Sequence, residues 1–331
     1  MLILAKYILQ RLIQLIPILL GITLLSFAMM HLAGGDAVTE LYSNAGAAVS
    51  QDVIDAARAK RGLDKPFVIQ YFVWLGGLLT GNMGISYISG RDVFSTFVSK
   101  LPATLLLTAA SISLTVLFSI PLGVLAAVAC DKSQSARDVP RRLLYALADY
   151  SIRFFSFVGN SLPNFFTALL LMHLFSIRLG LLPVISDGVT LRGAVMPALT
   201  LAIAMSAKYL RQVRAAVLEE LHQDYVMGAK ARGVRNGVIL WRSVIRSSML
   251  TMVTLLALSI GNLLGGTAII ENIFLWDGVG KLAVDAIAMR DYPMIQAYVV
   301  WMAVIYVLVN LMTDLLYHAL DPRIRLEAIR E

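Results

Sequence analysis

The chain has 331 residues, of which 58% are hydrophobic and 15% charged, and its mean hydropathy is +0.76. Soluble domains have about 45–50% apolar and about 25% charged residues, so this composition excludes an ordinary soluble protein. The net charge is +7, and the charged residues are clustered between uncharged runs rather than interspersed. Such clusters of basic residues are expected in the cytoplasmic loops of a membrane protein, so nucleic-acid binding is not needed to explain the charge.

Uncharged runs define the predicted elements. Five of them reach the ~20 residues that a helix needs to cross a bilayer core, and they cover residues 12–35, 101–130, 154–177, 247–270 and 294–313. A shorter run at 193–207 is expected to complete the topology. Because open sheets cannot satisfy their backbone in lipid, we predict an all-α polytopic membrane protein with about six transmembrane helices.

The first run is expected to be a retained span. It exceeds the 7–15 apolar residues of a signal peptide, and no A-x-A site follows it. Placing the N-terminus inside puts most Lys and Arg residues in the cytoplasm, including Arg323, Arg325 and Arg330 near the C-terminus. The positive-inside rule therefore predicts cytoplasmic termini, an extracytoplasmic segment at 33–100 and a cytoplasmic loop at 208–246.

The extracytoplasmic segment is predicted to contain an amphipathic stretch at 53–60, a turn at 61–66 and an aromatic run. Four rings in that run are expected to be interfacial anchors, because amphipathic rings favour the headgroup level; they are Phe67, Tyr71, Phe72 and Trp74. Glycines then predict an irregular loop, at Gly76, Gly77, Gly81, Gly84 and Gly90.

The third run contains the sequence GNSLPNFF at 159–166. Pro163 removes one backbone hydrogen bond, and Asn160, Ser161 and Asn164 supply polar groups beside it. Broken polar helix is tolerated in a membrane where it lines a cavity or is packed by neighbours. Both interpretations, a pathway lining and a packed kink, stay open from the sequence.

Ionisable groups near membrane depth are functional candidates by default. Asp149 and Arg153 are four residues apart, as are Asp314 and His318. Residues at this spacing meet on one helix face, which favours structural pairs.

Nucleotide chemistry has no support in the sequence DGVGKLA at 277–283. Gly278, Gly280 and Ala283 fit G-x-G-x-x-A, but that fingerprint needs a preceding strand and a following helix. A P-loop would need Gly at 275 and Ser or Thr at 282, where this chain has Leu275 and Leu282. We predict a tight turn on the outer face.

Metal and catalytic sites are equally unsupported. The histidines do not pair with Cys or with each other at metal-ligand spacing; His31 and His173, each beside methionine in an apolar run, are the weak candidates for a metal path. No catalytic triad, paired carboxylates or H-E-x-x-H stands out, so a membrane-embedded enzyme is not predicted. The single Cys130 excludes an internal disulfide.

The cytoplasmic loop contains the sequence DYVMGAKARGVRN at 224–236. Asp224 is predicted to be a helix N-cap, with Tyr225, Ala229 and Gly233 along one side. Small residues at Gly228, Ala229 and Ala231 would let another surface approach the backbone, whereas an ordinary positive-inside loop is the simpler interpretation.

At these residues the chain resembles the permease subunits of ABC importers of the peptide/nickel family. DYVMGAKARGV resembles their Glu-Ala-Ala loop, with Gly233 at the signature glycine, although Met227 replaces the signature Glu. The resemblance continues along nearly the whole chain, in RGLDKPFVIQYFVWL, LPATLLL, SLPNFF, GGTAIIENIFLWDGVG, RDYPMIQA and ALDPRIR. IIENIF with GVG most resembles the nickel-type first permease, although Asp277 replaces the usual Pro.

This resemblance implies a single type I ABC permease domain over 1–331 in the cell inner membrane. It implies that the loop couples to a separate ATPase through Asp224, Tyr225, Met227, Gly228, Ala229, Ala231, Arg232 and Gly233. The implied partners are a second, non-identical permease, two ATPase subunits and an extracytoplasmic solute-binding protein. This chain would bind no cofactor, since the partner ATPase uses ATP. The cargo would be nickel, a metal chelate or a di- or oligopeptide. The alternative is a self-sufficient secondary transporter or channel.

Overall fold

The computed structural model describes residues 2–33, 50–60, 64–136, 138–186 and 188–320. These residues are almost entirely helical, with an isolated antiparallel bridge between Ile85 and Asp92. The chain divides into two compact units, of which unit 1 contains Met1–Thr104 and Asp277–Leu308, and unit 2 contains Leu105–Trp276 and Val309–Glu331. The all-α prediction is confirmed, whereas the prediction of a single transmembrane domain stays a prediction.

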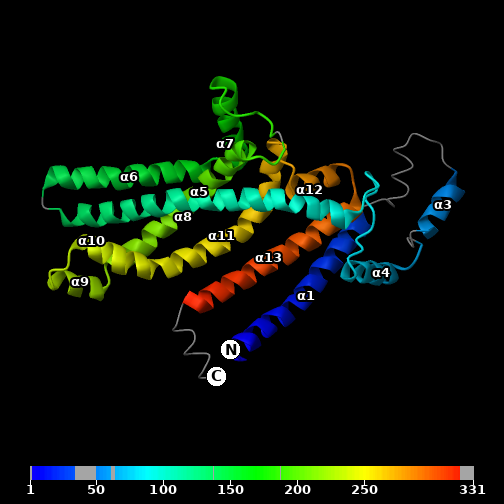
Figure 1. Ribbon diagram of the computed structural model, residues 1–331, viewed down its shortest axis with the longest axis horizontal. Coiled ribbons are helices and arrows are strands. Elements are labelled where there is room, and N and C mark those ends of the chain that lie inside the picture. Colours follow the sequence, from blue (N-terminus) through cyan, green and yellow to red (C-terminus); the bar gives the residue numbers. More distant parts are fainter. Residues whose placement is uncertain (1, 34–49, 61–63, 137, 187, 321–331) are drawn as a thin grey trace. The chain divides into compact units, whose positions relative to one another are not determined.

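The helices follow one another along the chain as Figure 1 shows. Their bounds are α1 Leu2–Ala33, α3 Gln51–Lys60, α4 Phe67–Leu79, α5 Val93–Ser135, α6 Val139–Ser161, α7 Asn164–Leu171, η1 Met172–Arg178, α8 Leu191–Leu221, α9 Asp224–Ala231, α10 Asn236–Ile239, η2 Leu240–Val244, α11 Ile245–Ile273, α12 Val279–Ala288 and α13 Tyr292–Leu320. The segments η1 and η2 are π-helical.

Five helical segments among the described residues are long and apolar enough to cross a membrane, or six if the bent pair of α6 with α7 and η1 is one span. This confirms the expectation of about six spans, including the fourth, which lies in the 31-residue helix α8. The third span differs from its prediction, because residues 154–177 do not form one straight helix. The chain bends by 104° between α6 and the helix that follows.

In unit 1, α4 packs on α1 through aromatic rings. The Phe27 ring lies 5.3 Å from Phe67, 5.6 Å from Tyr71 and 5.5 Å from Trp74. The Tyr71 hydroxyl is hydrogen-bonded to Thr23 at 3.0 Å, and Tyr71 is buried. Phe67, Tyr71 and Trp74 are therefore packing residues between two helices, which is a role that the prediction of interfacial anchors did not include.

The predicted glycine loop is shorter than expected, because Gly76 and Gly77 lie inside α4. Gly81, Gly84 and Gly90 do lie in the loop and have positive φ. The loop is fastened to the turn before α13 by the buried Asp291, whose carboxylate accepts hydrogen bonds from the Ser86 hydroxyl at 2.5 Å and the Tyr87 N–H at 3.1 Å.

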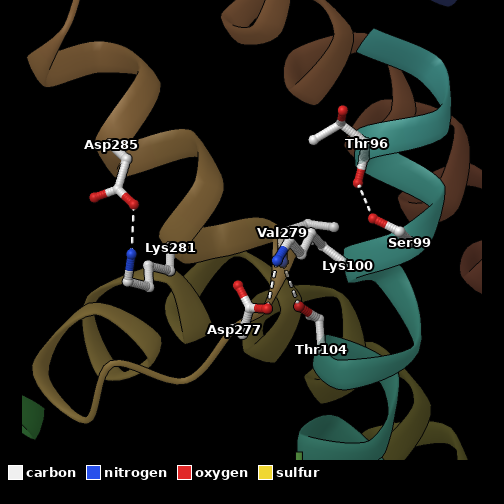
Figure 2. Close-up of polar contacts among 8 residues, drawn as sticks. All are labelled: Thr96, Ser99, Lys100, Thr104, Asp277, Val279, Lys281 and Asp285. Atoms are coloured by element: carbon white, nitrogen blue, oxygen red, sulfur yellow. Dashed lines mark hydrogen bonds and ion pairs between the residues drawn. The ribbon is translucent and has the colours of Figure 1, made fainter. Parts of the chain in front are cut away.

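The DGVGKLA segment differs from the predicted tight turn, because only Asp277 and Gly278 precede the helix and residues 279–283 form the first part of α12 (Figure 2). Lys100 of α5 pairs with Asp277, and the Thr104 hydroxyl accepts a hydrogen bond of 2.9 Å from the N–H of Val279, the first residue of α12. The preceding Leu275 and Trp276 follow helix α11 rather than a strand. The segment thus lacks the strand that a dinucleotide fingerprint requires.

Unit 2 is built around α8, which packs against α6 and α11. Its buried core contains residues from α5, α8, α9, α10, η2 and α11, namely Val124, Ala127, Tyr209, Val213, Val217, Leu221, Val226, Ile239, Val244 and Met252. The Tyr209 hydroxyl donates a hydrogen bond of 2.8 Å to the Met252 carbonyl, joining α8 to α11. The side chains of Asp314 and His318, and all of Arg323, Arg325 and Arg330, lie outside the described residues.

Candidate functional site

The loop at 224–236 is held on the core of unit 2 by one side of α9. Val226 is fully buried and packs in the same core as Leu221 of α8 and Ile239 of α10. Figure 1 shows α9 and α10 as short helices between the long helices α8 and α11. Val226 and Ile239 are the buried residues of these two short helices, and they anchor the otherwise largely exposed loop to the core.

The rest of α9 is largely exposed. Tyr225 and Met227 are 41% and 59% exposed, and Lys230 and Arg232 are also exposed. The Tyr225 hydroxyl donates a hydrogen bond of 2.7 Å to Glu220. Partial burial, followed by this hydrogen bond, raises the pKa of Tyr225 above its ordinary value, so the hydroxyl stays a neutral donor near neutral pH.

The end of α9 differs from its prediction. Asp224 is the first helical residue, because the extended residue before it, Gln223, is the N-cap. Gly233 lies beyond the helix with φ +77° and does not continue the side formed by Tyr225 and Ala229. A Cβ added at Gly228 or Gly233 would meet nothing within 4 Å.

The polar residues of the third run lie together at the break between α6 and α7. Asn160, Ser161 and Pro163 are exposed, and Asn164 is half-buried at the start of α7. Leu162 has φ −80° and ψ 128°, the extended conformation that a following proline imposes. The Ser161 hydroxyl donates a hydrogen bond of 2.9 Å to the Phe157 carbonyl. The structure thus shows a sharp break, and both the pathway and the packed-kink interpretations include one.

A bidentate charged contact between two helices of unit 2 was not predicted. Arg214 of α8 donates two hydrogen bonds to the Asp149 carboxylate of α6, at 2.7 Å and 2.9 Å. Arg153, the partner predicted from spacing, is farther away, at 3.7 Å. The one available signal was an acid in an apolar helix, which indicates that a partner exists without saying where it lies in the sequence.

The histidines considered for a metal path are both exposed. His31 lies on α1 in unit 1, with its ring 5.3 Å from Phe67, and His173 lies in η1 of unit 2. Among the residues that the structure describes, no group of three His, Cys, Asp or Glu side chains could hold a metal ion.

Known proteins resemble this chain along nearly all of its length. Residues 119–326 match the binding-protein-dependent transport system inner membrane component family, and residues 4–108 match the N-terminal part described for such membrane components. Over 332 residues the chain is 37% identical to the oligopeptide transport system permease protein AppB of Bacillus subtilis, covering 97% of this chain and 99% of AppB. Over 320 residues it is 35% identical to the glutathione transport system permease protein GsiC of Pectobacterium atrosepticum, with the same coverage.

Solved structures agree in fold. A structure of the MetNI methionine ABC transporter in an inward-facing conformation superposes with a TM-score of 0.56 at 17% identity, covering 68% of this chain and 96% of that chain. At this identity the likeness shows the fold alone, which is that of a type I ABC importer permease. The chain belongs to the family of binding-protein-dependent transport system inner membrane components, and it is a multi-pass inner-membrane permease subunit of an ABC importer rather than an enzyme.

Proposed function

We propose that this subunit imports di- or oligopeptides, and that its loop at 224–236 is the surface on which a separate ATPase docks. A second, non-identical permease would form the other half of the path, two ATPase subunits would use ATP, and an extracytoplasmic solute-binding protein would deliver the cargo. The chain itself would bind no cofactor. The N- and C-termini and the loop at 208–246 would face the cytoplasm, and 33–100 the outside, as the positive-inside rule predicts.

The docking proposal rests on one observation: the loop exposes apolar and basic side chains while α9 is anchored to the core of unit 2. Val226 holds α9 to the core, while Tyr225 and Met227, to either side of it, leave apolar area exposed, and Lys230 and Arg232 add exposed basic charge to the same loop. Exposed apolar area that is rimmed by polar residues is typical of interaction sites. Gly228 lies in the same surface with open space where its side chain would be.

Peptide cargo is favoured over nickel by the relatives. AppB and GsiC are described as permeases for oligopeptide and glutathione, and both match over 97% of this chain. The similarity of IIENIF and GVG to the nickel-type permease gains no specific support from them. We therefore propose a peptide importer and do not retain the nickel assignment.

A bulky side chain at Gly228 tests the docking surface. Gly228 is exposed and a Cβ there meets nothing within 4 Å, so the large ring of Gly228→Trp is expected to extend outward and to hold a partner away from the α9 backbone. We expect co-purification of the ATPase with the permease to fall by about tenfold or more, which corresponds to a loss of about 1.4 kcal/mol in binding.

Two control variants separate docking from folding. Gly228→Ala adds a single methyl group in open space, and Gly237→Trp places the same large ring on α10, where a Cβ also meets nothing within 4 Å. Both should retain the ATPase and all three should insert in the membrane. Normal ATPase co-purification with Gly228→Trp would show that this surface is not the docking site.

A further inference from the structure

Helices α6 and α8 contact each other along an antiparallel seam. Asp149 of α6 meets Arg214 of α8, and farther along the Ser156 hydroxyl donates a hydrogen bond of 2.5 Å to the Ala207 carbonyl. At the end of α6, a Cβ on Gly159 would lie 3.3 Å from the Ala207 Cβ. The seam from Asp149 to Gly159 follows α6 for about 15 Å at the rise of an α-helix.

The charged end of this seam is buried. The side chains of Asp149 and Arg214 are 7% and 18% exposed, whereas the third charge, Arg153, is 49% exposed. Two parallel hydrogen bonds from one guanidinium to one carboxylate fix both distance and orientation. Removing one partner of such a pair leaves an uncompensated buried charge, which is strongly destabilising, so each of the two side chains depends on the other.

The seam joins two parts of unit 2 that the chain separates. Below Arg214, α8 continues through Val217 and Leu221, which pack in the same core as Val226 of α9. At its other end, α6 stops at Ser161, next to the 104° break. Direct contacts therefore connect α9 to α8 through the core, and α8 to the end of α6 through the seam.

We propose that Asp149 and Arg214 are positioning residues that lock α6 to α8, so that docking on α9 moves both helices as one body and repositions the break at 160–164. This inference rests on the proposed docking of an ATPase at α9. It assigns the buried pair a role in coupling ATP hydrolysis to transport, in addition to its contribution to folding. Rigid elements that connect two sites in this way can bias an equilibrium at both.

Coupling is measured on the assembled transporter in liposomes, with its ATPase subunits, second permease and binding protein. The Asp149→Asn variant keeps the size of the side chain but leaves Arg214 without a charged partner. We expect it to retain the ATPase and to hydrolyse ATP, while cargo imported per ATP falls by about threefold or more, within the range seen for changes along coupling networks. The control Arg153→Gln removes the more distant, exposed charge and should leave this ratio unchanged.

A second variant separates the ion pair from general packing. In Asp149→Leu/Arg214→Met neither charge is left unpaired, so folding should be retained. Apolar side chains lack the fixed geometry of the guanidinium fork, and we expect cargo per ATP to stay low. Full recovery in this variant would overturn the proposal, because any packed contact would then suffice.

Distance measurements test the movement itself. Spin labels can be introduced at Leu147→Cys and Arg211→Cys, two exposed positions on α6 and α8, in a Cys130→Ser background. This background removes the single cysteine and keeps a hydrogen-bonding group beside Arg214. We expect the same label distance in the nucleotide-free and nucleotide-bound transporter, and a broadened distribution in Asp149→Asn. A distance that changes with nucleotide in the otherwise native chain would overturn the proposal, as would loss of insertion or of the ATPase in Asp149→Asn. Loss of the ATPase only with Gly228→Trp would still support the docking site.

Discussion

The two glycines of the docking loop meet different physical constraints. Gly228 lies inside α9, where the backbone is helical and an added Cβ meets nothing within 4 Å. Gly233 has φ +77° and closes the helix: its N–H donates to the Lys230 carbonyl at 3.0 Å, and the Val234 N–H donates to the Ala229 carbonyl at 3.2 Å. This pair of hydrogen bonds is the Schellman motif, in which glycine avoids the steric cost of the left-handed region. The main role of Gly233 is therefore to end helix α9.

Substitution at Gly233 should act through the backbone. Gly233→Ala places a Cβ in the left-handed region at a cost of about 1–2 kcal/mol, and its surroundings cannot add to this, because the Cβ meets nothing within 4 Å. Hydrogen exchange should show faster exchange of the Gly233 and Val234 amides, and ATPase co-purification should weaken as α9 frays.

Asparagine provides the matched comparison, because it tolerates the left-handed region better than alanine. Gly233→Asn should retain more amide protection and more ATPase than Gly233→Ala, although its side chain is larger. The reverse order would mean that Gly233 is needed for close approach of a partner. Gly233→Asp does not separate these roles, since it adds charge at the same time as strain.

The partner of Asp149 shows how far charged contacts can be predicted from the sequence. The i,i+4 spacing correctly placed Arg153 on the same face as Asp149, yet the bidentate partner is Arg214, on another helix. Local spacing determines contacts within one helix only. The pairing of α6 with α8 depends on tertiary packing, and the helical periodicity of a single sequence does not predict which helices will pack together.

At the scale of elements, proline alone does not decide where a helix ends. Pro163 stands at a 104° break, whereas α1 continues through Pro17 and α8 continues through Pro197. Pro197 is buried within α8, which nevertheless continues to Leu221. The sequence could therefore predict that the helix is interrupted at Pro163, but it could not predict the angle of the bend.

Replacing Pro163 should weaken the break. Alanine is favoured over proline in a helix interior by about 3 kcal/mol, so Pro163→Ala allows α6 and α7 to join. Labels at Phe157→Cys and Leu170→Cys would then lie about 20 Å apart along a straight helix, farther than across the bend. Uptake should fall as the residues at 160–164 move.

Pro197→Ala controls for the loss of proline itself. Because α8 is already continuous there, neither its geometry nor uptake should change appreciably. Uptake at the native rate in Pro163→Ala, together with a lengthened label distance, would show that the bend is a packed kink without a part in the path.

For the whole molecule, uncharged runs predicted the number and order of the spans, because lipid imposes a single strong rule on composition. The helices nevertheless extend past the runs: α5 covers Val93–Ser135 and α8 covers Leu191–Leu221, both with charged ends. Charged residues indicate where a helix leaves the lipid, but the helix itself can continue beyond them. The hydrogen bond between Asp291 and Ser86, in the loop before α5, joins residues about two hundred apart in sequence. No local sequence pattern predicts such a contact.

The identity of the cargo separates the peptide hypothesis from the nickel hypothesis, and it is measured on the whole assembly. If the cargo is a peptide that passes a non-specific path, no imidazole of this chain should be needed for import. We expect His31→Ala/His173→Ala to import a labelled peptide at the native rate in the reconstituted transporter, and the partner binding protein to retain peptide on purification. Both side chains are exposed, so the substitutions should leave the fold intact. Radioactive nickel uptake provides the comparison: nickel import that the native transporter performs and the double variant loses would instead establish a metal path through these residues.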